Sequence, residues 1–444
     1  SKDGGATWTT VTPKGMPTWG LCSMIDASPS DAATAYLALD NHENDDYKPY
    51  VYVTRNYGQS WELLVKGIDT ESPVRVVRED PKQPSLLYAG TETGLFISLD
   101  RGATWERFKS NLPVTPIHDL TIKNDDLVVA THGRAFWVLD DISPLRQIVA
   151  KTTEPFLFIP RDTMKVTWGG AGTGSVGKNP PSGFLINYFL PADTAGIEFE
   201  LVDPMGAVVA TTKVDGNAGF NRTTMTAPRY PGARSLPGLI FWGGGGSSLP
   251  APPGIYKVSM KTPAWSATRE ARLTKDPRTD GSDQDQMDQY LFARKIADRL
   301  TETHEAHAKI RDAKKKVTAI LEKDKSLTRA SESLMTKLSA IEEEIYQVKN
   351  QSGQDPLNYP IRLNNRIAAL LPVVLGGEGP PSRGSQAVFA RLSAELDDIL
   401  KRLGEVWAKE LVPFNAELTK KSLEVIVPEP TGLSQAGSGR RGGN

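Results

Sequence analysis

One eight-residue pattern occurs three times near the start of the chain, at positions 1–8, 54–61 and 98–105. Its form is Ser/Thr-x-Asp/Asn-x-Gly-x-Ser/Thr-Trp. The short carboxylate or amide can accept backbone N–H bonds inside a tight turn, and the glycine permits the positive φ at which a chain reverses. The tryptophan that ends each copy can bury a large ring beside the next strand. Three copies therefore predict three strand–turn–strand units of one design.

The repetition extends beyond this pattern. Ser28-Pro29 followed by Tyr36 recurs as Asp80-Pro81 followed by Tyr88, and a third unit without the eight-residue pattern is visible over 115–137. The sequence thus predicts about three repeated β units over 1–145. The residues expected to build the turns are Asp3, Trp8, Asn56, Gly58, Trp61, Asp100, Gly102 and Trp105.

The pattern resembles the Asp box, or BNR repeat, of sialidase-like and sortilin-like β-propellers. The resemblance implies that residues 1–148 form about three C-terminal blades of a propeller, with the boxes as structural turns at its rim. Because propellers close with roughly 4–8 blades, three blades cannot close a ring. Upstream blades of the same protein are therefore expected partners of this segment, and any signal peptide would lie upstream as well.

Two further regions and a tail are predicted after the repeats. Over 149–278, short apolar stretches such as 197–201 and 254–260 alternate with turns, which predicts a β-sandwich resembling Ig-like or fibronectin-III-like modules. Over 279–425, apolar residues recur at steps of three and four, which predicts an antiparallel helical bundle. Residues 426–444, which end in a run rich in Gly, Ser and Arg, are predicted to be a disordered tail. The expected fold class is multidomain, mainly β and then α.

Composition excludes some classes of partner. The chain has 52 basic and 53 acidic residues, so no overall charge favours binding to nucleic acid. No apolar run approaches the roughly 20 residues that span a bilayer, so no transmembrane segment is expected. The single cysteine, Cys22, cannot form an intrachain disulfide.

Four residues of the repeats are candidates for ligand binding. His118, His132 and Arg134 belong to the third unit, in the stretches PIHDL and ATHGRAFWVLDD, and Arg78 belongs to an earlier predicted strand. His132 follows a strand end, a usual place for the axial ligand groups of a propeller. The structural alternative is a histidine that hydrogen-bonds the backbone of a neighbouring blade.

The acidic loop 40–46 is the densest cluster of oxygen ligands in the sequence. Calcium takes about 6–8 such ligands, so Asp40, Glu43, Asp45 and Asp46 are candidates for a Ca²⁺ site. Their spacing does not match the Asp-x-Asp-x-Asp-Gly loop, and a solvated surface loop is the alternative.

No catalytic residue is assigned from the sequence. A sialidase-like site needs an arginine cluster, a tyrosine nucleophile with a glutamate base, and an acid/base aspartate. Residues of these types are present, but their spacing does not assemble them into one site: Arg75, Arg78, Arg134, Tyr52 and Glu79. The stretch 304–307, His-Glu-Ala-His, lacks the His-Glu-x-x-His spacing of a zinc protease, so a polar layer among helices is expected there.

Taken over its length, the chain looks like the bacterial BNR-repeat, sortilin-N-terminal-like proteins. The likeness is most specific over 45–146, in stretches such as DDYKPYVYVTRNYGQSW and LLYAGTETGLFISLDRGATW. It implies a secreted, periplasmic or cell-surface protein. The leading hypothesis is a non-enzymatic binding or assembly protein for a protein, peptide or glycan ligand. The alternatives are a sialidase-like glycoside hydrolase whose site is completed by upstream blades, and a structural subunit of a homo-oligomer or larger assembly.

Overall fold

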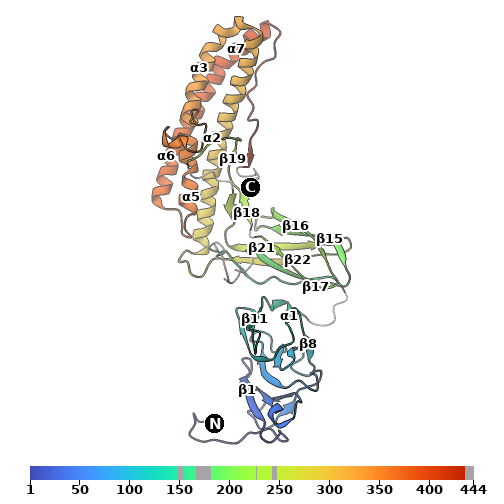
Figure 1. Cartoon of the computed structure of the whole chain (residues 1–444). Helices are drawn as coiled ribbons and strands as arrows, with labels where there is room; N and C mark the ends of the chain where they lie inside the picture. The colour runs from blue at the N-terminus through green and yellow to red at the C-terminus, as the bar shows by residue number, and fades with distance from the viewer. Residues whose placement is uncertain (149–153, 167–181, 227, 243–247, 436–444) are drawn as a thin grey trace. The chain divides into compact units, whose positions relative to one another are not determined.

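A computed structural model describes residues 1–148, 154–166, 182–226, 228–242 and 248–435 (Figure 1). The chain divides into two compact units. The first comprises residues 1–161, 187–194 and 216–222, and the second comprises residues 162–186, 195–215 and 223–444. The first unit is built mainly of strands, whereas the second combines strands with a C-terminal helical region. The predicted boundaries at 148/149, 278/279 and 425/426 stay predictions.

Three antiparallel sheets make up most of the first unit, and in each sheet the strands neighbour one another in chain order. The first sheet contains β1 (Leu21–Ala27), β2 (Ala35–Asp40), β3 (Tyr50–Thr54) and β4 (Glu62–Leu63). The second contains β5 (Val74–Glu79), β6 (Leu87–Thr91), β7 (Gly94–Ser98) and β8 (Glu106–Phe108). The third contains β9 (Ile117–Lys123), β10 (Asp126–Thr131) and β11 (Phe136–Leu139). The sheets therefore follow the sequence repeat.

The sheets pack on one another in chain order. Strand β5 contacts β1 and β2, and β9 contacts β5 and β6. One apolar core, which includes Val53, Phe96 and Trp105, joins the first two sheets, and another, which includes Tyr88 and Ile117, joins the second and third. Burying a side chain such as Phe96 contributes about 2–3 kcal/mol, so each interface between sheets is a main source of stability.

Each sheet has the same two ends. The eight-residue boxes connect β3 to β4 and β7 to β8, and the β1–β2 and β5–β6 turns lie at the same end because neighbouring strands are antiparallel. We call this the box end. The opposite end, called the loop end, holds the segments 40–50, 64–73, 91–94, 109–117 and 131–135.

The first strand of every sheet carries a β-bulge close to the loop end. The pairing register skips one residue in each strand: Ser23 in β1, Arg75 in β5 and His118 in β9. Bulges re-aim side chains, and they are common beside functional sites. The three skipped residues occupy corresponding places in the repeats and differ in chemistry.

The first unit ends in a short helix and a small aromatic cluster. Helix α1 spans Ser143–Gln147, with Pro144 in its first turn, where the missing N–H costs nothing. Strands β12 (Phe156–Leu157), β14 (Phe184–Leu190) and β17 (Gly219–Met225) form a three-stranded sheet. The ring of Phe158 stacks on Phe220 with centroids 5.7 Å apart.

A five-stranded sheet occupies the strand-rich part of the second unit. Its order is β13 (Thr163–Met164), β22 (Ser266–Thr274), β21 (Gly254–Lys261), β15 (Thr194–Val202) and β16 (Val208–Gly216). Two short ladders accompany it: β18 (Arg229–Pro231) with β20 (Ser248–Pro250), and β19 (Arg234–Ser235) with β23 (Ser434–Gln435). Alternate residues of β15 and β21, such as Phe199 and Val258, are buried, which agrees with the period-two pattern of the sequence.

The helical region runs from 283 to 420. Its helices are α2 (Asp283–Lys323), α3 (Thr328–Ile345), α4 (Leu363–Ala368), α5 (Leu370–Leu375), α6 (Arg383–Val406) and α7 (Val412–Lys420), with a π-helical turn over Trp407–Leu411. The side chain of Ser282 and that of Asp285 form a capping box that starts α2. Helix α2 packs along α3, α4, α5 and α6 (Figure 1). Among the described residues, no helix is long and apolar enough to cross a membrane.

His307 lies inside this helical region, as the apolar spacing predicts. It is 2% exposed, and its Nε2 is 3.2 Å from a carboxylate oxygen of Glu342 on α3. His304, one turn earlier, is equally buried and bonds the carbonyl of Arg234 at 2.7 Å. Burial, reinforced by His307, outweighs the hydrogen bond that the ring donates to the Arg234 carbonyl and lowers the pKa of His304 to about 4. His307 therefore belongs to a polar layer of the helical packing, whereas His304 bonds strand β19.

The predicted tail differs from the structure over residues 426–435. Ile426 is buried, and its N–H donates to the side-chain oxygen of Asn415 at 2.8 Å. The N–H of Glu429 donates to Asp312 at 3.0 Å, and β23 pairs with β19. The apolar run around Ile426 anchors this segment, while the Gly/Ser/Arg composition behind the prediction begins only near 434. Residues 436–444 lie outside the described residues.

Candidate functional site

The three boxes share one set of hydrogen bonds; the second and third lie at the box end, and the first precedes β1. In each, the first hydroxyl accepts the N–H of the fifth residue, at 2.7 Å for Ser1, 2.8 Å for Thr54 and 2.8 Å for Ser98. The third residue accepts the N–H of the seventh, at 2.9 Å for Asp3, 2.9 Å for Asn56 and 2.8 Å for Asp100. The fourth and fifth residues have positive φ in all three copies. The side chains of the first and third residues of every box thus stabilise the turn in which they lie.

Ionisation of the box carboxylates follows from these bonds. The hydroxyl and the N–H of Thr7, with help from Ser1, lower the pKa of Asp3 to about 2. For Asp100, burial opposes the charge, but bonds from Thr104 and Ser98 outweigh it and hold the pKa below its usual value. Both carboxylates are ionised acceptors at neutral pH, and neither is poised to donate or accept a proton.

The box tryptophans differ in what they contact. The indole N–H of Trp105 donates to the carbonyl of Leu64, directly after β4 of the first sheet, at 3.0 Å. That of Trp61 donates to the carbonyl of Val11, in the segment before β1, at 2.7 Å. Each ring therefore reaches back to the chain before its own sheet. Trp105 is 3% exposed, whereas Trp8 of the first box is 80% exposed.

The loop end carries a network of charged side chains across the first two sheets. The guanidinium of Arg75 pairs with Asp40 at 2.6 Å and with Glu92 at 2.6 Å. Asp40 also accepts from the ring Nδ1 and the N–H of His42. Asp40 ends β2 and Glu92 directly follows β6, each at the loop end of the second strand of its sheet, and the bulge in β5 places Arg75 between them.

The structure brings His118 and His132 together at the corresponding place in the third sheet. Their rings stack with centroids 4.8 Å apart. The N–H of His132 donates to the carbonyl of Pro116 at 2.9 Å, so its backbone is fixed to the strand that carries His118. Arg134 lies in the following turn, where its N–H donates to Thr131, and it is exposed. These three predicted residues form one exposed polar edge.

Arg78, the fourth predicted ligand residue, has a different role in the structure. Its Nη1 is 2.7 Å from Asp26 on β1, its Nη2 is 3.0 Å from Asp119 on β9, and its Nε donates to the carbonyl of Leu120 at 2.8 Å. One guanidinium therefore joins the first strands of all three sheets, and the structure does not place it with His118 and His132 as a free binding group.

The acidic-loop candidates for calcium are not brought together. Asp40 is used by His42 and Arg75, and Asp46 accepts from Tyr50 at 2.6 Å and from Asn41 at 3.1 Å. Over the described ranges, no group of three or more His, Cys, Asp or Glu is arranged to hold a metal ion. The calcium site stays a prediction without geometric support.

Residues of the sialidase type are likewise separated. Arg75 sits at the loop end of β5, while Glu79, at the box end of the same strand, accepts from the hydroxyls of Ser28 and Ser30. Tyr52 is buried within β3. The described residues therefore do not form the predicted glycosidase set.

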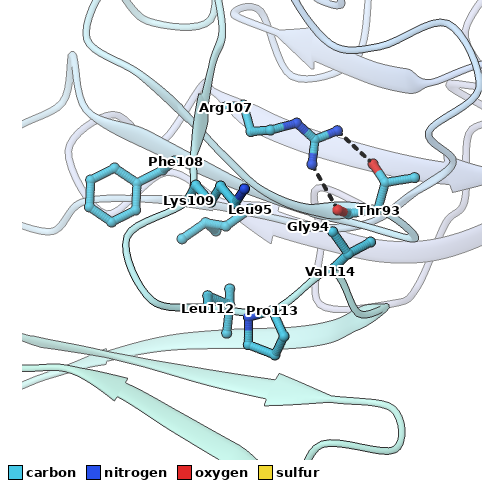
Figure 2. A pocket seen from close by; sticks show the side chains of 9 residues that line it. All are labelled: Thr93, Gly94, Leu95, Arg107, Phe108, Lys109, Leu112, Pro113 and Val114. Atoms are coloured by element: carbon cyan, nitrogen blue, oxygen red, sulfur yellow. Dashed lines mark hydrogen bonds between the residues drawn. The ribbon is translucent and has the colours of Figure 1, made fainter.

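Two grooves open at the loop end, at corresponding places in the first and second sheets. The larger, about 710 Å³, lies between residues 45–50 and a second wall made by Leu63, Val65, Ile68, Thr70 and Glu71; we call it the acidic groove. The smaller, about 210 Å³, is lined by residues 93–95, 107–109 and 112–114, and we call it the basic groove (Figure 2). In each case a third strand begins one wall, and a fourth strand with the loop after it forms the other.

The basic groove has a fixed cation and an apolar floor. Arg107 donates to the carbonyl of Thr93 at 2.8 Å and to its hydroxyl at 3.0 Å (Figure 2). It also pairs with Asp69. Its guanidinium also lies 4.7 Å from the centre of the Phe96 ring. Since Asp69 belongs to the loop beside the acidic groove, the Arg107–Asp69 pair joins the two grooves.

Sequence reasoning missed the residues that give the loop end its chemistry. The main ones are Glu92, Tyr47, Glu71 and Arg107, while Arg75 was considered only for a sialidase-like arginine cluster. Alignment of the repeats would have found two of them: alignment on the boxes pairs Leu63 with Arg107, and alignment on Tyr36 and Tyr88 pairs Asp40 with Glu92. The sequence itself shows positions at which two repeats share the same box but carry different residues.

Comparisons with known proteins give only remote likenesses. Neither a protein-family model nor a curated protein matches the sequence. Among solved structures, a GH74 xyloglucanase from Xanthomonas campestris is similar with a TM-score of 0.23 and 13% identity, over 57% of this chain and 38% of that one. A GH74 enzyme from Niastella koreensis gives 0.23 and 12%, over 56% and 37%. YCF48 from Cyanidioschyzon merolae gives 0.20 and 15%, over 55% and 70%.

This chain thus spans little more than a third of the length of the GH74 structures, with 38% and 37% covered. At these TM-scores the likenesses carry no argument about activity or ligand.

Proposed function

We propose that this chain is part of an extracytoplasmic β-propeller protein that binds a protein or peptide ligand at the loop end of its sheets. In this proposal the three sheets are consecutive blades, the second unit supplies an Ig-like module and a helical bundle, and no reaction is catalysed by the residues described. The ligand contacts are His118, His132 and Arg134, together with the two grooves.

The observation that carries the proposal is the contrast between the two ends of the sheets. In every box the first and third side chains bond their own turn, while His118, His132 and Arg134 form an exposed polar edge at the loop end. Function belongs to sites rather than to scaffold motifs, so the end with uncommitted polar groups is the better binding surface.

The exposed apolar surface supports the idea that further blades of the same protein adjoin these three. Trp61 and Trp105 each reach back to a preceding segment, so Trp8, with the same box, is expected to dock against a preceding blade. On the third sheet, Phe136 is 76% and Val138 54% exposed, on a face of the kind that a next blade covers.

Selection from a peptide library displayed on phage tests the proposal. The purified chain is the bait, and selected peptides are resynthesised and titrated. Arg134→Ala should weaken their binding about tenfold, whereas Arg55→Ala, an exposed arginine in the second box, should leave it unchanged. The proposal fails if the two variants act alike.

A glycoside hydrolase is the competing result. Turnover of a sialoside or an aryl glycoside by the purified chain, abolished by Asp45→Asn or Glu71→Gln in the acidic groove, would replace the binding proposal. We expect no turnover, because the described carboxylates and arginines are not assembled into a catalytic set.

A further inference from the structure

The acidic groove exists because the first sheet carries an insertion. Between β2 and β3 the chain spans residues 41–49, whereas β6 and β7 are joined by Glu92 and Thr93 alone. The inserted loop is internally bonded: the N–H of Asp45 donates to His42, that of Asp46 to Asn41, and the Tyr50 hydroxyl to the Asp46 carboxylate at 2.6 Å. This wall is therefore held in place before any ligand binds.

The groove has an excess of negative charge. Three carboxylates line it, those of Asp45, Asp46 and Glu71, against the single ammonium of Lys48. The bond from the Tyr50 hydroxyl lowers the pKa of Asp46, although burial opposes this, so the carboxylate is ionised at neutral pH. In the described part of the chain, the side chains of Asp45 and Glu71 have neither an ion pair nor a hydrogen-bond partner, so their charge is available to a ligand.

Apolar and aromatic surface lies beside these charges. The ring of Tyr47 is 50% exposed and Leu63 is 46% exposed, while buried Ile68 lies at the base of the groove. Apolar and aromatic surface beside carboxylates suits a lysine or arginine side chain. Its methylene stem can cover the apolar surface while its cationic head contacts a carboxylate or a ring face. Neutral sugars would leave the unpaired carboxylates without a counter-charge.

We propose that the acidic groove binds a lysine or arginine side chain presented by an extended peptide segment of a partner protein. The inference rests on the proposed function and names the chemistry of its ligand. The stem lies against Leu63 and Ile68, and the cation meets Asp45 and Glu71.

The basic groove is a control supplied by the same fold. It occupies the corresponding place in the second sheet, and its lining has the opposite charge, with Arg107 and Lys109 and no carboxylate (Figure 2). A ligand selected only by the general shape of a blade would bind both grooves. A ligand selected by charge would prefer one.

The experiment uses the full chain and three synthetic peptides with blocked ends, Ala-Ala-Val-X-Val-Ala-Ala, in which X is lysine, glutamate or norleucine. Norleucine keeps the stem of lysine and removes its charge. Binding is followed by changes in NMR signals and by fluorescence anisotropy at low and high salt. The lysine peptide should bind at least about tenfold more tightly than the other two, and salt should weaken it.

Two variants locate the site. Asp45→Asn with Glu71→Gln should reduce lysine-peptide binding at least about tenfold, while Lys109→Gln in the basic groove should not change it. All three residues are exposed, so unfolding midpoints should match the parent chain and exclude misfolding. Equal binding of the norleucine peptide, or binding that survives loss of both carboxylates, overturns the inference.

Failure of this inference is distinguishable from failure of the proposed function. If the lysine peptide does not bind but library-selected peptides still depend on Arg134, the loop end is a binding surface and only the assignment of the acidic groove is wrong. If neither depends on the loop end, both are wrong.

Discussion

The two ends of the same three sheets are built on opposite principles. In the boxes, corresponding residues repeat both in type and in contacts: Asp3, which precedes the first sheet, and Asn56 and Asp100, at the box end, accept the same N–H bond at 2.9, 2.9 and 2.8 Å. At the loop end, corresponding bulge residues are Ser23, Arg75 and His118, and none makes the contacts of another.

This difference separates residues that specify the fold from residues that are free to specify a ligand. A turn has few solutions, because the positive φ values and the orphan N–H groups must be satisfied wherever the chain reverses. Many different side chains are tolerated on a groove wall, because the backbone hydrogen bonds of the sheet beneath it form whichever side chain is present. The positions at which the repeats differ from one another are therefore the best candidates for residues that contact a ligand.

The largest expected effect comes from the box tryptophans. Trp105→Ala removes a buried ring and its bond to Leu64, and it should lower the free energy of unfolding by about 3–5 kcal/mol. Trp8→Ala, at the same place in a box whose ring is 80% exposed, should change it by less than about 0.5 kcal/mol. Urea unfolding followed by circular dichroism measures both.

Equal effects of the two substitutions would break the comparison. They would mean that stability comes from the box turn alone and not from the contact that its tryptophan makes with the preceding sheet. Trp61→Ala, whose ring is half-buried and bonded to Val11, should fall between them.

A smaller effect is expected where an arginine serves the scaffold. Arg78→Ala leaves Asp26 and Asp119 without their shared cation and should lower the free energy of unfolding by about 1–3 kcal/mol, since the group is only partly buried. Arg134→Ala should leave stability within about 0.5 kcal/mol, because its side chain is exposed. Thermal and urea unfolding of the two variants provide the measurement. Loss of ligand binding by Arg78→Ala without loss of stability would restore Arg78 as a ligand residue.

Much of the fold was predictable, because its determinants are local. The boxes, the period-two strands and the apolar spacing of α2, α3 and α6 each depend on neighbours in sequence, and the structure adds a capping box of Ser282 and Asp285 that starts α2. Contacts between residues that are distant in sequence were harder to predict. The stacking of His118 on His132 was inferred only as membership of one blade, and the three partners of Arg78 lie on strands far apart in sequence.

The site was harder to predict for a physical reason. Arg75 reaches Asp40 and Glu92 because a bulge turns it, and a bulge is not encoded by a distinctive residue in these strands. The unpaired charge of Glu71 becomes visible only when the folded loop places it beside Tyr47 and Asp45. The sequence gives the chemical type of each side chain, whereas the pairing register of the strands decides which other side chains lie beside it.

The smallest expected effect tests whether the boxes are interchangeable. Asn56 already occupies the acid position in the second box, where its oxygen accepts the Ser60 N–H at 2.9 Å and its amide donates to the Ser60 hydroxyl at 2.8 Å. Asp100→Asn can form the same pair with Thr104, so at neutral pH it should change the free energy of unfolding by less than about 1 kcal/mol.

Acid distinguishes the two versions of the box. The pKa of Asp100 is lowered on folding, so the ionised carboxylate contributes stability that is fully present above its unfolded pKa and is lost as pH falls through the folded value. An asparagine has no such dependence. The stability difference between the parent chain and Asp100→Asn should therefore shrink between pH 7 and about pH 3, and Asn56→Asp should introduce the same dependence into the second box. Urea midpoints at several pH values measure both. If both variants keep the pH dependence of the parent's unfolding free energy, ionisation of the box carboxylates does not stabilise their turns. Their common geometry is then no evidence of a common structural role.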